Sequence, residues 1–263
     1  GDAPYWFVHR ADLIDLLAQQ ARVAGLELRP GQAVADIVAD GGPQAQVVFD
    51  DARCLEADLV VAADGLHSVM RRAGTLNAAR FTRQAAWRAV VPNTMGHPPE
   101  VRVHMGPGRH TVSYPLRTGS HVNLVAVEER DAWTEDGWTH ADTAQAVQRA
   151  FADFCAPVHQ MLDLVEAPGL WGLFRRPVAK RPWDGRVAMI GDAAHPTLPF
   201  LAQGANMALE DAWVLADVLT SEPTLEAAAG AYNALRVARC ERIVAAANGN
   251  AWKYHLRAPL VRR

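Results

Sequence analysis

The spacing of apolar residues changes several times along the chain and predicts different elements in turn. After Asp12, which is placed to cap a helix, apolar residues recur at helical spacing as far as Gly25 and predict one amphipathic helix. Short strand candidates follow at residues 26–30, 33–40 and 45–51. The turn GGP between the last two candidates favours an antiparallel ribbon over a βαβ unit.

Two segments far apart in the chain, ADLVVAADG and RVAMIGD, are almost wholly apolar. This pattern predicts strands that are buried on both faces of a parallel sheet. The first segment ends in Asp64-Gly65 and the second in Gly191-Asp192. Ligands of open α/β sheets gather at the carboxyl ends of the strands, and ionised Asp accepts hydrogen bonds from hydroxyl groups. The two ends therefore predict a site for a polyol or a ribose.

The pattern changes character between about residues 81 and 173. Apolar and polar residues alternate in short runs with Gly, Pro and charged residues at the breaks, which predicts a mostly antiparallel sheet with one helical stretch at 141–155. A link rich in Trp and Pro, residues 171–185, leads back to the second buried strand. The rest of the chain is predicted to be helical, at 206–219 and 224–252.

The loop between the second buried strand and the next helix, GDAAHPTLPFLAQGAN, is more elaborate than a connection requires. Gly204 allows the backbone to approach a ligand closely. A helix that starts at Ala205 or Asn206 points its positive dipole end at that place, where it stabilises an anion. His195 stands before a proline, and both a functional role and simple hydrogen-bonded packing are open for it.

The turn after the first buried strand, DGLHSVMR, has two interpretations. In the structural one, Asp64 caps the turn and Gly65 relieves backbone strain. In the functional one, the backbone N–H groups and Arg71 face a phosphate.

Composition excludes several classes of protein. The chain has 263 residues, of which 50% are hydrophobic, and a net charge of -3, so no clustered basic surface for nucleic acid is expected. Its three cysteines are widely spaced, and we expect neither a disulfide framework nor a metal site. Because no apolar run has the length of a membrane span and no signal peptide is visible, we expect no membrane partner and a cytoplasmic location.

Two motifs identify a family resemblance. DGLHSVMR, from Asp64 to Arg71, resembles the DG motif, and GDAAHP, from Gly191, resembles the GD motif, of single-component FAD-dependent aromatic hydroxylases. These are the group A flavoprotein monooxygenases with the para-hydroxybenzoate hydroxylase fold. Further segments, among them VHRADL, AWRAVVP and NGNAWKYHL, are similar to the branch of salicylate hydroxylase and 6-hydroxynicotinate 3-monooxygenase.

The resemblance implies FAD as the cofactor, NAD(P)H as the reductant and co-substrate, O2 as the oxidant and a homodimer. It implies that Asp192 binds the ribityl hydroxyls, that Asp64 and Gly65 lie near the pyrophosphate, and that Arg10 faces the flavin phosphate or ribityl chain. It also implies that Gly204, Ala205 and Asn206, where the helix starts, lie against the pyrimidine edge of the flavin, and that Pro199 is a further cofactor-binding residue.

The expected substrate is a small aromatic compound of the salicylate, hydroxybenzoate or hydroxypyridine kind. His110 and Tyr114 are four residues apart in a predicted strand and therefore share one face. If that face meets the ligand, the two catalytic candidates can orient a phenol and withdraw its proton. The alternative is that they form a polar outer face or an aromatic core contact.

These expectations combine into an α/β (α+β) fold. It consists of a Rossmann-like FAD/NAD(P)-binding domain that lacks its N-terminal βαβ unit, an inserted antiparallel-sheet substrate domain, and C-terminal helices. The expected ranges are 1–76 for the first part of the FAD-binding domain, 77–176 for the substrate-binding sheet, and 177–263 for the second part with the helices.

One departure from the family pattern is expected to matter. The sequence contains no G-x-G-x-x-G string, the usual cradle for the ADP pyrophosphate. The chain is then expected to be a fragment of a full monooxygenase, or to receive the missing part from another chain. A non-catalytic remnant acting as a binding or oligomerisation module, and another flavin oxidoreductase on the same fold, such as a flavin reductase or a halogenase, remain alternatives.

Because the pyrophosphate loop is missing, these 263 residues alone are predicted to bind FAD poorly. The check is an absorption spectrum of the purified chain after mixing with excess FAD and desalting. Retention of the flavin with a micromolar or smaller dissociation constant would contradict the prediction.

Overall fold

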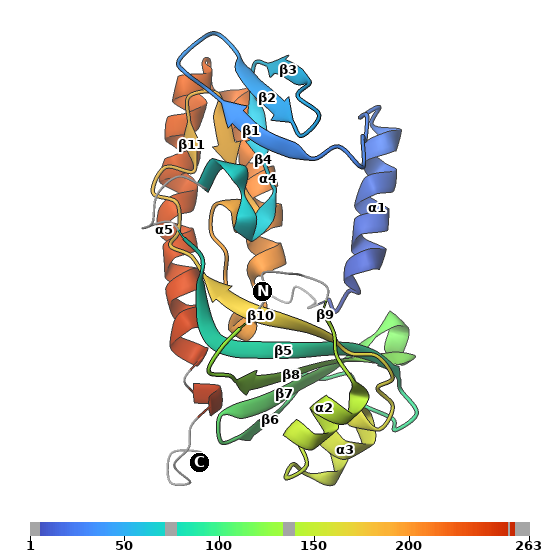
Figure 1. The fold of residues 1–263 in the computed structure, drawn as a ribbon. Helices are drawn as coiled ribbons and strands as arrows, with labels where there is room; N and C mark the ends of the chain where they lie inside the picture. Colours follow the sequence, from blue (N-terminus) through green and yellow to red (C-terminus); the bar gives the residue numbers. More distant parts are fainter. Residues whose placement is uncertain (1–5, 72–77, 134–139, 252, 256–263) are drawn as a thin grey trace. The chain divides into compact units, whose positions relative to one another are not determined.

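The computed structural model describes residues 6–71, 78–133, 140–251 and 253–255, which form parts of two compact units (Figure 1). The first unit comprises Gly1–Pro30, Phe81–Leu173 and Lys253–Arg263. The second comprises Gly31–Arg80 and Phe174–Trp252. The expected assignment of residues 1–76 and 177–263 to a flavin domain and 77–176 to a substrate domain stays a prediction. The structure groups the first thirty residues with the antiparallel sheet, and the contacts responsible are given below.

The first unit is built on a six-stranded sheet with the strand order β6-β7-β8-β5-β10-β9. Its strands are β5 (Arg80–Pro92), β6 (Arg102–Gly106), β7 (Arg109–Leu116), β8 (His121–Glu129), β9 (His140–Ala141) and β10 (Gly169–Arg175). Its helices are α1 (Arg10–Val23), α2 (Ala144–Ala150) and α3 (Ala156–Leu162). The strands β5, β6, β7 and β8 confirm the alternating segments of the sequence. Strand β6 pairs with β7, β7 with β8, and β8 with β5, and all three pairs are antiparallel.

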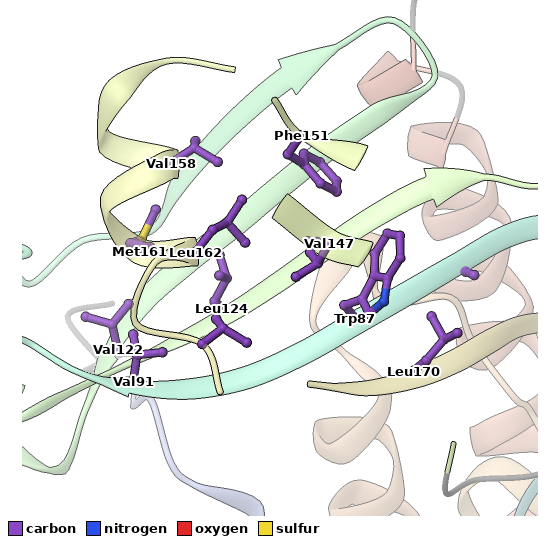
Figure 2. Close-up of a cluster of buried hydrophobic side chains, with 13 residues drawn as sticks. Trp87, Val91, Val122, Leu124, Val147, Phe151, Val158, Met161, Leu162 and Leu170 are labelled. Atoms are coloured by element: carbon purple, nitrogen blue, oxygen red, sulfur yellow. The ribbon is translucent and has the colours of Figure 1, made fainter. Parts of the chain in front are cut away.

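One face of this sheet carries the core of the unit. Trp87 of β5 and Leu124 of β8 pack with Val147, Phe151 and the apolar side of α3 (Figure 2). The indole Nε1 of Trp87 donates to the Asp142 carboxylate at 2.8 Å, so the polar atom of this buried side chain is satisfied. Helices α2 and α3 therefore cover this face.

The opposite face of the sheet carries the two predicted catalytic residues. Ser113 pairs with the core residue Leu124, so its neighbour Tyr114 points to the other face, as His110 does. Several apolar side chains on this face are exposed, among them Val90 and Met105. The even spacing of His110 and Tyr114 thus has the structural consequence predicted from sequence.

Helix α1 confirms the first predicted helix but begins three residues early, after His9, which makes no capping side-chain bond. None of its residues is buried. Asp12 is not the cap: it lies in the first turn and pairs with both the Nε and an Nη of Arg117, at 3.0 and 2.8 Å. Phe7 stacks on Tyr114 with ring centroids 5.1 Å apart. These contacts hold the segment against the strand β7 and explain its grouping with the sheet.

The second unit contains two small sheets and two long helices. Its strands are β1 (Val34–Val38), β2 (Ala45–Phe49), β3 (Cys54–Ala57), β4 (Val60–Ala62), β11 (Trp183–Asp184) and β12 (Val187–Met189). Its helices are α4 (Gly204–Ser221) and α5 (Leu225–Ala251). Strands β1 and β2 pair antiparallel, as the GGP turn predicts.

The two predicted buried strands are neighbours in one sheet, although 127 positions separate paired residues such as Val60 and Val187. Strand β12 pairs in parallel with β4 and antiparallel with β11. A core of Trp183, Ala188, Leu215 and Tyr232 joins this sheet to α4 and α5.

The prediction that both strands are buried on both faces is wrong for β4. Val61 is 41% exposed, whereas Ala188 on β12 is fully buried. Within the described chain β4 is an edge strand of the sheet β11-β12-β4.

Other boundaries also differ from the sequence-based expectations. Residues 26–30 form no strand, and β3 and α3 were not predicted. The expected link 171–185 begins inside β10, because Leu170 and Leu173 are buried in the first unit. In each case tertiary packing overrode a weak local pattern. No helix in the described part of the chain has the length and apolar character required to cross a membrane.

Replacing Leu215 by Ala is predicted to lower the free energy of unfolding by about 2–5 kcal/mol, because the side chain is buried in the α4–α5 core. Leu209→Ala on the same helix is the control. It removes a 48% exposed side chain and is expected to change stability by no more than about 0.5 kcal/mol. Urea unfolding of both variants tests the assignment of the core, and equal losses would contradict it.

Candidate functional site

The carboxyl ends of β4 and β12 lie side by side in the second unit. The backbone N–H of Ile190 donates to the Ala62 carbonyl at 3.0 Å, which carries the parallel pairing to the end of both strands. The two strands are followed by the 3₁₀ turns Gly65–His67 and Gly191–Ala193, which contact each other. Asp64 and Asp192 are both exposed there. The two turns that carry these carboxylates are therefore neighbours at one edge of the sheet.

Asp64 serves in part as the cap that the structural interpretation expected. Its Oδ2 accepts a hydrogen bond from the Val69 N–H at 2.8 Å. Gly65 follows with φ of 77°, a left-handed conformation in which a side chain would be strained. The residues Asp64 and Gly65 thus shape the turn, and the exposed carboxylate retains further acceptor positions.

Arg71 does not face a phosphate, contrary to the functional interpretation of the DG turn. Its guanidinium is buried and donates to the carbonyls of Pro177, Ala193 and Ala194 at 2.5, 3.3 and 3.0 Å. Burial, with a contribution from Arg176, lowers the pKa of Arg71 to about 10. The side chain is used to connect the first turn to the second.

Arg176 makes a second connection. Its Nη1 donates to the Leu66 carbonyl at 2.5 Å and its Nη2 to the Arg71 carbonyl at 3.3 Å. Arg71 thus joins the DG turn to the GD turn, and Arg176 joins the DG turn to the segment that follows β10, in both cases through backbone carbonyl groups. Such groups are orphan acceptors in short turns, and burying them requires donors of this kind.

Two glycines allow the GD loop to lie close to helix α4. Gly191 has φ of 58°, and a Cβ placed there would be 3.3 Å from the Cβ of Ala208. A Cβ on Gly204 would be 3.3 Å from Cγ2 of Thr197. Both positions are tighter than ordinary packing, so the close approach that was predicted for Gly204 occurs within the chain itself.

The start of α4 is suited to an anion. Gln203 precedes the helix without a capping side-chain bond, and Ala205 and Asn206 in the first turn are exposed. The helix has 18 residues, so its N-terminal N–H groups carry a substantial positive potential. Pro199 is exposed in the preceding 3₁₀ turn, Pro199–Leu201.

Behind these exposed residues lies a buried ionic network centred on Asp211 of α4. Its Oδ2 accepts from the Gly191 N–H at 2.8 Å and pairs with Nε2 of His195 at 2.5 Å. Its Oδ1 accepts from Nε of Arg236 at 2.7 Å. His195 is therefore part of the packing of the loop, which decides between the two roles left open by the sequence.

The network shifts the pKa values of its members. Burial by itself lowers the pKa of His195, but hydrogen bonds and charge interactions with Asp211 and Cys240 outweigh it and raise the pKa to about 10. Burial raises the pKa of Asp211, and the bonds from His195, Gly191 and Arg236 reverse this, so that its pKa is lowered. Asp211 is an anion and His195 a cation at neutral pH.

Arg236 extends the network along α5. Its Nη1 donates to Glu210 at 2.8 Å, and its Nη2 donates to the Met207 carbonyl at 3.2 Å. Arg239 also donates to both oxygens of Glu210. These bonds, with Arg239 first and burial opposing, lower the pKa of Glu210 to about 2.

Ligand atoms of His195, Asp211 and Cys240 lie within 4.8 Å of one another. The Asp211 carboxylate already accepts from three donors, and the Arg236 guanidinium brings positive charge to the same place. A cation would have to displace these partners, so the arrangement is that of an ion pair.

Each of the two turns holds a buried polar atom without a hydrogen-bond partner. These are Oγ of Ser68 in the DG turn and Nδ1 of His195 in the GD loop. Both residues are at most 3% exposed. Because neither atom is accessible, both orphans are internal to the turns and do not face a ligand.

The remaining predicted residues, Arg10, His110 and Tyr114, belong to the first unit. His110 is buried, and its Nδ1 bonds to Nε2 of His255 at 2.7 Å, while Nδ1 of His255 bonds to Glu129 at 3.2 Å. Burial, with the neighbouring His255, lowers the pKa of His110 to about 3. The imidazole is therefore neutral at physiological pH.

Tyr114 is half-buried on the same face and stacks on Phe7. Arg10, at the start of α1, and Tyr114 both lie close enough to Arg88 to affect its pKa, which burial lowers. The structure thus brings Arg10 and Tyr114 to one region, together with Arg88, which the sequence analysis did not single out.

Sequence reasoning missed the buried residues that support the two turns, which are Arg176, Asp211 and Arg236. It also assigned Arg71 to a phosphate and missed its supporting role. The adjacent acids Glu210 and Asp211 in a helix were a visible signal. Their partners lie 16 to 29 positions away, and nothing local indicates them.

Comparison with known proteins gives consistent results. A family described as FAD binding domain matches residues 4–247. The chain is 35% identical over 260 residues to a 3-amino-4-hydroxybenzoate 2-monooxygenase of Streptomyces cremeus, covering 97% of this chain and 64% of the relative. It is 32% identical to a 3-hydroxybenzoate 6-hydroxylase of Polaromonas naphthalenivorans, covering 96% and 64%. The chain thus spans just under two thirds of the length of these relatives.

Solved structures that are similar to this chain cover it over a comparable length. A salicylate hydroxylase in a substrate complex is 28% identical with a TM-score of 0.80, covering 97% of this chain and 68% of that one. Klebsiella pneumoniae HpxO, complexed with FAD and uric acid, is 23% identical with a TM-score of 0.83, covering 96% and 65%, and shares the fold. These similarities confirm the predicted mixed α/β fold with an antiparallel sheet and C-terminal helices.

The raised pKa of His195 predicts that stability depends on pH above neutrality. The folded protein binds this proton with a pKa of about 10, against an ordinary value of 6.5, so the stabilisation is fully present below about pH 6.5 and is lost as the pH rises through 10. The free energy of unfolding of the wild type, measured with urea, should fall as the pH rises across this window. His195→Gln keeps a donor but does not titrate, so its dependence should be flatter.

His67→Gln, at an exposed position of the same unit, is the matched control and should keep the wild-type dependence. If His195→Gln retained the full slope, the pairing of a charged imidazole with Asp211 would be wrong.

Proposed function

The chain belongs to the FAD binding domain family, and we propose that it is part of an FAD-dependent monooxygenase that hydroxylates a small aromatic compound with NAD(P)H and O2. The family resemblance expected from the DG and GD motifs is thereby confirmed. One observation carries the proposal: two parallel strands end in the exposed carboxylates of Asp64 and Asp192, beside the uncapped start of α4.

The residues present fit FAD. An ionised Asp192 accepts hydrogen bonds from the hydroxyls of a ribityl chain. The N–H groups and positive dipole at Gly204, Ala205 and Asn206 suit a ring edge that gains negative charge on reduction.

When bound, FAD supplies the hydride and oxygen chemistry, and the protein supplies position and electrostatics. In this proposal Asp64 and Gly65 lie near the pyrophosphate and Asp192 fixes the ribityl chain. Arg10 contributes a positive charge towards the phosphate or ribityl side. Pro199 shapes the loop before α4.

The substrate side is proposed to be the open face of the six-stranded sheet. The relatives named above act on hydroxylated benzoates, according to their names, and a phenol-bearing ring is the substrate class proposed here. Tyr114 is half-buried on that face and presents a hydroxyl that can orient a phenol. His110 is neutral and bonded to His255, and its low pKa favours a role in orientation over proton withdrawal.

A homodimer and a cytoplasmic location, both expected from the sequence, belong to the same proposal. All three cysteines are free, in agreement with a reducing compartment.

Asp192→Asn in the full-length protein is predicted to weaken FAD binding at least about tenfold, because the neutral amide loses a charge-assisted hydrogen bond to a ligand hydroxyl. Titration of FAD followed by flavin fluorescence measures the change. Asp217→Asn, at an exposed carboxylate on α4, is the control and should bind FAD normally.

The wild type should also oxidise NAD(P)H with uptake of O2 when given hydroxybenzoates or hydroxypyridines. Hydroxylated product is the supporting result. Oxidation of NAD(P)H without hydroxylation of any aromatic would favour a flavin reductase, and absence of flavin from the protein would overturn the proposal.

A further inference from the structure

Asp211 is fully buried on α4 and has no access to a ligand, yet its contacts converge on the loop that carries Asp192. We propose that Asp211, supported by Arg236, is a positioning residue for the cofactor, because it holds the GD loop and aims the Asp192 carboxylate beside the start of α4. The inference rests on the proposed function and adds a determinant of cofactor binding outside the exposed residues.

A single oxygen atom holds both ends of the loop. Oδ2 of Asp211 accepts from the N–H of Gly191, the residue before Asp192, and pairs with the imidazole of His195 three residues after it. Asp192 lies between these two anchors, so the position of the Asp211 carboxylate sets the course of the backbone on both sides of it. Movement of Asp211 therefore moves Asp192.

The second oxygen and the helix start are held by one residue of α5. Arg236 donates from Nε to Oδ1 of Asp211 and from Nη2 to the carbonyl of Met207, in the first turn of α4. The guanidinium has a rigid planar shape, so these two bonds fix the carboxylate and the helix start relative to each other. Asp192 and the uncapped N–H groups of α4 are thus positioned by the same buried pair.

The arrangement requires the charge of the carboxylate. Three donors converge on Asp211, and a carboxylate accepts from all of them, whereas an amide of the same size presents N–H groups to at least one. Asp211→Asn therefore preserves volume but breaks the network. Asp211→Glu retains the charge and both acceptor oxygens, and Arg236 has long, adjustable reach to them.

The test measures FAD affinity and the visible circular dichroism of the bound flavin in the full-length protein. Asp211→Asn should raise the FAD dissociation constant by about tenfold to a hundredfold, the range expected for loss of charge-assisted hydrogen bonds, and should alter the flavin dichroism. Asp211→Glu should recover part of the affinity.

A matched control separates positioning from general stability. Asn233 of α5 forms two hydrogen bonds with the backbone of Trp183, at 3.0 and 2.8 Å, in the same unit, and neither bond involves the GD loop. Asn233→Ala should lower the melting temperature without changing FAD affinity or dichroism. If its FAD affinity fell as much as that of Asp211→Asn, the positioning role would be overturned.

A second pair of variants serves if Asp211→Asn does not fold. His195→Leu removes one anchor and leaves Asp211 paired with Arg236, and it should weaken FAD binding, whereas His195→Gln restores a donor and should bind nearly normally. Equal affinities of the two variants would contradict the inference. If the wild type binds FAD and the Asp211→Asn variant binds it equally well, only this inference is overturned. If the wild type binds no flavin, the proposed function is overturned as well.

Discussion

The buried carboxylate of Asp211 is the interaction on which the rest of the candidate site depends. A charge removed from water is costly unless it is paired and hydrogen-bonded, and Asp211 has a donor on every side: Gly191, His195 and Arg236. The network joins the end of β12, the start of α4 and the middle of α5. Because loss of any partner leaves a buried charge uncompensated, these three elements are held together in one arrangement.

The exposed and buried residues of the two motifs have different tasks. Asp64 and Asp192 reach the surface at the ends of the parallel strands, where a ligand can meet them. Arg71 and Arg176 are buried and bind backbone carbonyls of the neighbouring turn. The arginine that a motif search assigns to a phosphate is thus used to fix the geometry, and the surface is left to residues that accept hydrogen bonds or offer backbone N–H groups.

The first unit follows a different principle. Its sheet buries one face against α2 and α3 and leaves the other to a mixture of apolar side chains with Arg88, His110 and Tyr114. Such a face, apolar but with a few directed polar groups, has the composition of a surface that receives an aromatic ligand. The neutral state of His110 results from burial beside His255, which no property of the strand itself determines.

The sequence by itself determined the long helices, most of the strands, the antiparallel middle of the chain and the two Asp-Gly turns, because periodicity and turn residues act over a few positions. It also predicted Asp64, Asp192 and Gly204 as members of the candidate site. Only the tertiary structure decided that Arg71 binds carbonyls about 120 residues away, that His110 meets His255 across 145 positions, and that Asp211 anchors the GD loop. Contacts of this kind depend on which elements pack together, and no local pattern encodes the partner of a buried charge.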